Sequence, residues 1–145
     1  MNIQEDKIMS GINELIRVEA DNTISFGNHQ LSEKTKLTDF EFEGDLYKVK
    51  TFHGLTKLEK NGGFVYESVP GSTVKHFMVG VDAVSFTVEA ENDVQITMEL
   101  EEDKVYRVFV NNTNIGQMRT NLGGKVSISV ALNAQKTASV FIEKA

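Results

Sequence analysis

Apolar and polar residues alternate without a break along Val84-Ser85-Phe86-Thr87-Val88-Glu89-Ala90. The same alternation returns over residues 94–100 and again over residues 126–132. Successive side chains of a β-strand point to opposite faces of the sheet, so a period of two is typical of strands that bury one face and expose the other. The pattern therefore predicts antiparallel sheets.

Turn residues divide the rest of the chain into further short strands. Asn-Gly at residues 61–62 is the strongest hairpin signal, and the asparagine-rich stretch 111–114 predicts a second hairpin tip. Two more hairpins are expected across residues 21–22 and 43–45, and a polar loop over residues 27–36. Strands at this regular spacing favour a mainly β chain, an antiparallel β-sandwich. The strands are expected near residues 16–20, 23–26, 40–42, 46–50, 56–59, 64–67, 74–79, 84–90, 94–100, 105–110, 115–119, 126–132 and 139–142.

The N-terminal stretch from Gln4 to Arg17 has a different period. Ile8, Ile12 and Leu15 recur at helical spacing, which predicts a short amphipathic helix, although Gly11 weakens it. Such a helix either covers an end or edge of the sheet or presents these three residues to another copy of the chain.

The length of 145 residues fits a single domain with its own core. Pro70 is the only proline, and with Gly71 it separates the first half from the more regular second half. A division into two small sub-lobes, 1–70 and 71–145, is therefore an alternative to one undivided domain.

Composition excludes several classes of partner and site. The net charge of −6, with basic residues scattered along the chain, argues against a nucleic-acid partner. The absence of cysteine excludes disulfides and thiolate metal sites. No stretch approaches the apolar length of a membrane helix, and the first residues lack the apolar core of a signal peptide. We therefore expect a cytoplasmic protein that does not bind membranes.

Carboxylates supply the first candidates for chemistry. Glu41, Glu43 and Asp45 lie close together in sequence, and glycoside hydrolysis uses two carboxyl groups that flank the scissile bond. On a strand, Glu41 and Glu43 would share one face, opposite Phe40 and Phe42. A half-buried strand with a solvated face has the same pattern, and this interpretation is favoured. The histidines at positions 29, 53 and 76 lack metal-ligand spacing, so we expect neither a metal nor another cofactor.

Aromatic residues supply the second set of candidates. Tyr47 and Tyr66 fall in strands of the first half and are the candidates for the aromatic walls of a binding site. Aromatic residues within strands more often pack in the core, which is the favoured alternative.

Several stretches of the chain resemble a known group of proteins. They are residues 15–27, residues 44–51 with 58–62 and 66–71, and Thr120-Asn121-Leu122-Gly123-Gly124-Lys125-Val126-Ser127. They resemble a family of small proteins from Firmicutes (Clostridia-type bacteria) that often carry the label endosialidase. The resemblance implies an enzyme that acts on glycans, but no family motif identifies a catalytic residue in this chain.

Two functions are consistent with these observations. The first is a non-catalytic interaction module that binds a protein, a glycan or another copy of itself, with self-association as the simplest version. The alternative is a glycan-active enzyme that uses the carboxylates around residues 41–45, with Tyr47 and Tyr66 as walls.

Overall fold

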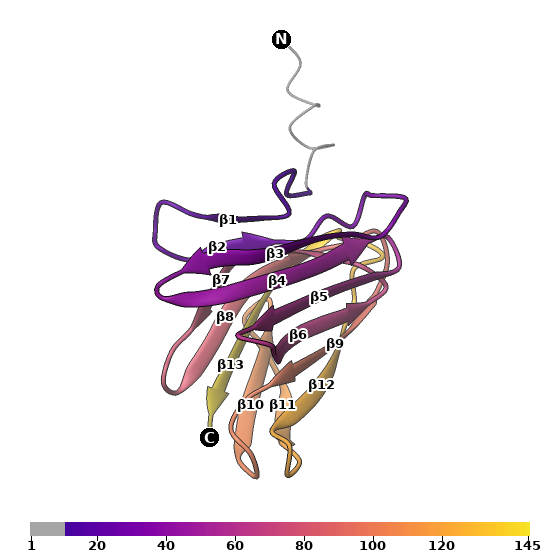
Figure 1. The fold of residues 1–145 in the computed structure, drawn as a ribbon. Coiled ribbons are helices and arrows are strands. Elements are labelled where there is room, and N and C mark those ends of the chain that lie inside the picture. Colours follow the sequence, from indigo (N-terminus) through magenta and orange to yellow (C-terminus); the bar gives the residue numbers. More distant parts are fainter. Residues whose placement is uncertain (1–10) are drawn as a thin grey trace.

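A computed structural model describes residues 11–145 as an all-β protein with two antiparallel sheets (Figure 1). The first sheet has seven strands in the spatial order β1-β2-β7-β8-β13-β10-β11. Their bounds are β1 Ile16–Val18, β2 Ile24–Phe26, β7 Thr73–Val79, β8 Ala83–Glu89, β13 Thr137–Lys144, β10 Val105–Val110 and β11 Thr113–Arg119.

The second sheet has six strands in the order β12-β9-β6-β5-β4-β3. Their bounds are β12 Lys125–Val130, β9 Val94–Glu99, β6 Gly63–Val69, β5 Leu55–Lys60, β4 Asp45–Phe52 and β3 Thr35–Phe42. Strand β3 begins within the stretch that the sequence predicts as a loop, because Thr35, Lys36 and Leu37 pair with β4.

The predicted hairpins are present, and their turns explain their sequences. Asn61 and Gly62 join β5 to β6 with φ of 51° and 81°. Asn111 and Asn112 join β10 to β11 with φ of 51° and 66°. Two consecutive residues with positive φ form the turn whose twist matches that of antiparallel strands, and glycine and asparagine tolerate this conformation best.

The two sheets share one hydrophobic core. The apolar residues of the alternating stretches, such as Phe86 and Ile96, are buried, while their polar neighbours face outward. Tyr66 of the six-stranded sheet lies edge-on against Phe26 and Phe86 of the seven-stranded sheet, with ring centroids 5.3 and 5.8 Å apart. These edge-to-face contacts tie the two layers together beyond the burial of area alone.

A chain of buried hydroxyl groups closes the core at one end, where β4 and β6 end and β5 and β7 begin. The Thr51 and Thr56 hydroxyls are 2.8 Å apart, and Thr56 donates to the Ser72 carbonyl at 2.7 Å. The Ser72 hydroxyl lies 2.6 Å from that of Ser68 and 2.8 Å from that of Tyr66. Because each of these polar groups has a partner, they can be buried without a large desolvation cost.

The outer face of the seven-stranded sheet carries an aromatic pair. Phe109 of β10 and Phe141 of β13 are cross-strand partners whose ring centroids lie 5.9 Å apart, and Phe141 is 39% exposed.

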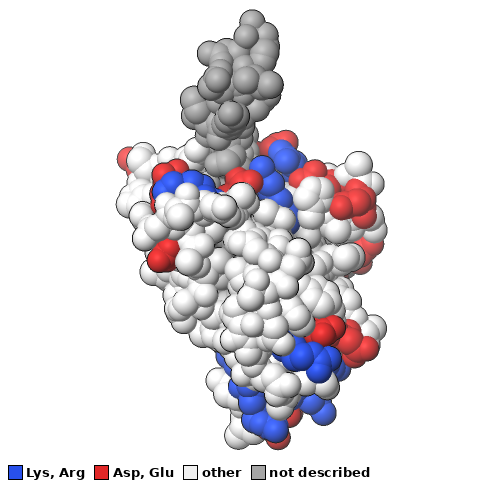
Figure 2. Space-filling view, turned by 180° about the vertical axis from the view of Figure 1, so that it is seen from behind, with Lys and Arg blue, Asp and Glu red and all other residues white. Residues whose placement is uncertain are grey.

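Seen from behind, charged side chains gather toward the two ends of the molecule, and its middle is largely uncharged (Figure 2).

One expectation from the sequence needs correction. No helix is found in residues 11–17: a turn closed by the hydrogen bond from the Leu15 amide to the Ile12 carbonyl precedes β1, and Ile16 and Arg17 then pair with β2. Residues 4–10, with Ile8, lie outside the described residues. Both sheets combine strands from either side of Pro70.

Candidate ligand-binding cleft

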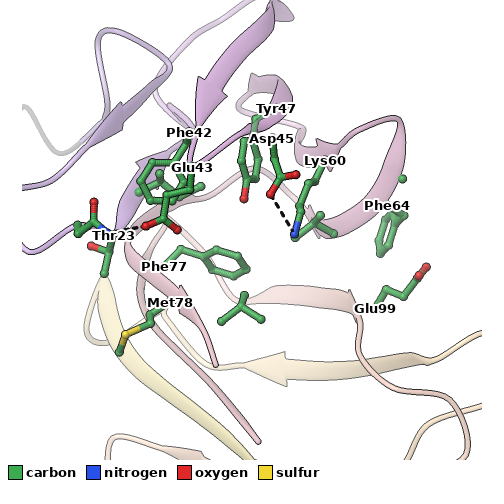
Figure 3. Close-up of a pocket in the computed structure, with 15 residues that line it drawn as sticks. Thr23, Phe42, Glu43, Asp45, Tyr47, Lys60, Phe64, Phe77, Met78 and Glu99 are labelled. Atoms are coloured by element: carbon green, nitrogen blue, oxygen red, sulfur yellow. Dashed lines mark hydrogen bonds and ion pairs between the residues drawn. The ribbon is translucent and has the colours of Figure 1, made fainter. Parts of the chain in front are cut away.

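A cleft of about 460 Å³ opens at the end of the core opposite the hydroxyl chain. Pockets of this size are typical of sites for small ligands. It lies where β4 and β6 begin and β3, β5, β7 and β9 end, so both sheets contribute to it (Figure 3). The lining residues are Asn22, Thr23, Ile24, Phe42, Glu43, Asp45, Tyr47, Lys60, Gly63, Phe64, Val65, Phe77, Met78, Val79 and Glu99.

Aromatic rings form much of the cleft surface. Phe42 and Tyr47 lie on the two adjacent strands of the β3–β4 hairpin with ring centroids 6.2 Å apart, and both are half-buried. Phe77 is nearly fully buried and continues from the cleft into the core. Burial raises the pKa of Tyr47, and the carboxylates of Asp45 and Glu43 add to this rise. The Tyr47 phenol therefore stays neutral at physiological pH.

Two carboxylates stand beside these rings (Figure 3), and each has a partner. Asp45 accepts a hydrogen bond of 2.9 Å from the side-chain amide of Asn61 and lies 3.5 Å from the Lys60 ammonium. The Asn61 hydrogen bond, with the charge of Lys60, lowers the pKa of Asp45. Glu43 accepts a hydrogen bond of 2.6 Å from the Asn22 amide, which joins the β3–β4 turn to the β1–β2 turn.

The charge of the cleft is negative. Its lining includes three carboxylates, those of Glu43, Asp45 and Glu99, and one ammonium group, that of Lys60. Lys125 does not line the cleft, but its ammonium group lies 3.7 Å from Glu99 and 5.0 Å from the centre of the Phe64 ring, so it offsets the charge of Glu99. The cleft therefore favours neutral or cationic ligands over anionic ones.

Contacts outside the cleft hold the β1–β2 turn, which carries Asn22 and Thr23, in place. The Thr23 hydroxyl donates to Asp21 at 2.5 Å, and Asp21 also lies 2.9 Å from Nδ1 of His76 on β7. The Thr23 hydroxyl, with the His76 contact, lowers the pKa of Asp21. This set of contacts positions the cleft rim instead of lining the cleft, because neither Asp21 nor His76 is among the lining residues.

Three of the residues selected from the sequence meet in the cleft, and two do not. Glu43, Asp45 and Tyr47 line it. Glu41 is the cross-strand partner of Leu46 on the opposite, exposed face of the hairpin, whereas Glu43 lies in the turn with φ of 52°. The prediction that Glu41 and Glu43 share one face is therefore wrong, because the chain leaves the strand conformation at Glu43.

Tyr66 is not a wall of the cleft. Its side chain is fully buried, and its hydroxyl bonds to Ser72 in the closed end of the core. Burial raises its pKa strongly, so the phenol stays protonated. The half-buried rings of Phe42 and Phe64 line the cleft instead, and neither is among the candidates that the sequence supplies.

The residues expected at an oligomer contact have different surroundings. Ile12 is fully buried, and its backbone amide donates to Gly27 at 3.0 Å. Leu15 is half-buried against the core, and Ile8 lies outside the described residues. Ile12 therefore has no surface to offer to another copy of the chain.

Comparisons with known proteins identify no relative of this chain: no family model, no curated protein and no solved structure matches it. Within residues 11–145, no group of three or more histidine or carboxylate side chains is arranged to hold a metal ion. The same residues contain no helix of the length and apolar character that a bilayer crossing requires.

Proposed function

We propose that this protein is a non-catalytic β-sandwich module that binds a glycan in the cleft, and that the glycan is neutral or carries amino sugars. The observation that carries the proposal is the combination of half-buried aromatic rings with fixed hydrogen-bonding groups at the open end of the core. Sugar rings offer apolar faces that stack on aromatic side chains and hydroxyl groups that bond to carboxylates and amides.

The negative charge of the cleft supports this choice of glycan. A sialylated chain carries carboxylates, which Glu43, Asp45 and Glu99 would repel. The protein has three arginines, at positions 17, 107 and 119, and none lines the cleft. The arginine fork is the group best suited to bind a carboxylate in two places, so its absence from the cleft lining favours a ligand without one.

The pKa of Asp45 argues against this residue as the general acid of glycoside hydrolysis. A general acid for that reaction needs a carboxyl whose pKa is raised toward neutrality. The pKa of Asp45 is instead lowered, so its carboxylate is ionised and serves as a hydrogen-bond acceptor. Glu41, the third carboxylate of the enzymatic alternative, faces away from the cleft.

The proposal is tested with an array of immobilised glycans that includes neutral, amino-sugar and sialylated chains. We expect binding to neutral or amino-sugar chains and weaker binding to sialylated ones. Tyr47→Ala removes a ring from the cleft and is expected to weaken the affinity for the best chain about tenfold, which corresponds to about 1.4 kcal/mol.

A matched control lies next to Tyr47 in the same strand. Leu46 is 48% exposed on the opposite face of β4, so Leu46→Ala should leave the affinity unchanged. An array without binding, a preference for sialylated chains, or equal losses in the two variants would each overturn the proposal. Release of reducing sugar from a bound chain by the wild-type protein would instead establish the enzymatic alternative.

A further inference from the structure

We propose that two copies of this protein associate through the free edge of β12, which extends the six-stranded sheet across a two-fold axis. The juxtaposition that carries the inference is an open edge strand whose central sequence reads the same in both directions. This proposal is independent of the glycan cleft, to which β12 contributes no lining residue.

Three of the four edge strands of the two sheets carry a feature that hinders pairing with a further strand. Strand β1 has only three residues. In β3 the pairing register shifts at Asp39, whose φ is 59°, and in β11 it shifts beside Gly116, whose φ is 128°. Short edges and bulges are the devices by which proteins prevent edge-to-edge pairing. Strand β12 has none of them, because its six residues pair with β9 in one continuous register.

The backbone of β12 leaves polar groups available at this edge. The Leu100 amide donates to the Gly124 carbonyl at 2.7 Å, so these two residues form a hydrogen-bonded pair that continues the β9–β12 ladder. In an antiparallel ladder every second residue pair is hydrogen-bonded in this way. Val126, Ile128 and Val130 therefore direct their amides and carbonyls toward β9, and those of Ser127 and Ser129 point away from it. At Lys125 the edge is closed, because both its backbone groups bond to Asn121.

The sequence of the open stretch suits a second copy of itself. It reads Val126-Ser127-Ile128-Ser129-Val130, a palindrome centred on Ile128. Antiparallel pairing about a two-fold axis at Ile128 places Ser127 of each copy opposite Ser129 of the other. Each of these two residue pairs exchanges two backbone hydrogen bonds. An isologous contact of this kind requires a self-complementary surface, which a palindrome provides.

The side chains at such a seam are compatible on both faces. Val126, Ile128 and Val130 are buried on the core face. In the dimer, the apolar side chains of one copy would therefore lie next to the same apolar side chains of the other. Ser127 and Ser129 are exposed on the outer face, where they bond to Thr97 and Gln95 at 2.9 and 2.6 Å. No like charges oppose each other over residues 126–130, because all five are uncharged.

The test uses two charge variants and their mixture in sedimentation velocity over a wide concentration series. The wild type is expected to show a monomer–dimer equilibrium. In S127K/S129K the introduced lysines would face each other across the seam, and in S127E/S129E the glutamates would do the same. Each variant alone should dimerise at least tenfold more weakly, and an equimolar mixture should regain a dimer that contains one copy of each.

A control variant adds the same charge elsewhere. Thr137 and Ser139 are exposed on the outer face of β13, a central strand of the other sheet, so T137K/S139K should dimerise like the wild type. Circular dichroism verifies that every variant is folded. A wild type that stays monomeric at all concentrations, or a dimer that the β12 variants do not weaken, would overturn the proposal.

Discussion

Tyr47 and Tyr66 belong to the same sheet but meet different surroundings. Tyr47 lies near the beginning of β4, where it lines the cleft, so its ring is half-buried beside two carboxylates. Tyr66 lies further along β6, where Ser68 and Ser72 offer partners to its hydroxyl, so its ring can fill the core completely. The position of a tyrosine along its strand therefore decides whether it supports the fold or remains available to a ligand.

At the residue scale, His29 makes stability depend on pH. Its side chain is 5% exposed, its Nδ1 lies 2.7 Å from the Thr73 hydroxyl, and burial lowers its pKa below 6.5. The unfolded chain therefore binds a proton to this group more readily than the folded protein does. We predict that the free energy of unfolding decreases as the pH falls from about 6.5 through the lower pKa of the folded state.

Urea unfolding at a series of pH values measures this effect. His29→Gln removes the titrating group and should flatten the dependence between about pH 5 and 6.5, above the range in which carboxylates titrate. His53 is exposed, so His53→Gln is the matched variant and should retain the dependence. An unchanged pH profile in His29→Gln would show that His29 is not its source.

At the scale of elements, the hairpins follow from local sequence. Asn61 and Gly62 adopt the positive φ that a two-residue turn requires, and the flanking residues of β5 and β6 alternate between core and surface. These signals lie within a few residues of one another, so they could be predicted from the sequence. The bulges of β3 and β11 have no comparable local signal. The alternation is interrupted between Leu37 and Phe40, so the sequence predicts only the part of β3 that follows the bulge.

Gly62 allows a test of the turn alone. Its φ is 81°, and no heavy atom lies within 4 Å of the position that a Cβ would take. Gly62→Ala should therefore destabilise the protein by about 1 kcal/mol through backbone conformation only. The neighbouring Gly63 has no positive φ, so Gly63→Ala should cost clearly less. Denaturant unfolding compares the two variants, and equal losses would contradict this explanation.

At the scale of the whole molecule, the order of strands could not be predicted from the sequence. β13 lies between β8 and β10, and β9 lies between β12 and β6, although these neighbours are far apart in the chain. Such pairing depends on which buried faces fit together, and alternation alone does not specify it. The cleft shares this origin: Asp45 and Tyr47 were predicted from one hairpin, but Phe77 and Asn22 come from the other sheet.

The interleaving of the two halves makes a prediction about fragments. Each sheet needs strands from both sides of Pro70, so residues 1–70 and residues 71–145 each lack neighbours for several strands. We predict that neither fragment, produced separately, shows the dispersed amide signals of a folded protein in NMR spectra, and that the full chain unfolds in one cooperative transition. A dispersed spectrum from either fragment would show that it is an autonomous unit.

The central position of β13 also has a consequence for synthesis on the ribosome. Until residues 137–144 have left the exit tunnel, β8 and β10 have no strand between them, and the incomplete sheet has two unpaired edges. Nascent chains with such open edges are prone to associate with one another. The folding of the seven-stranded sheet is therefore a late event. Slower translation of the residues between β8 and β13 would lengthen the time during which these edges are unpaired, without helping the sheet to close.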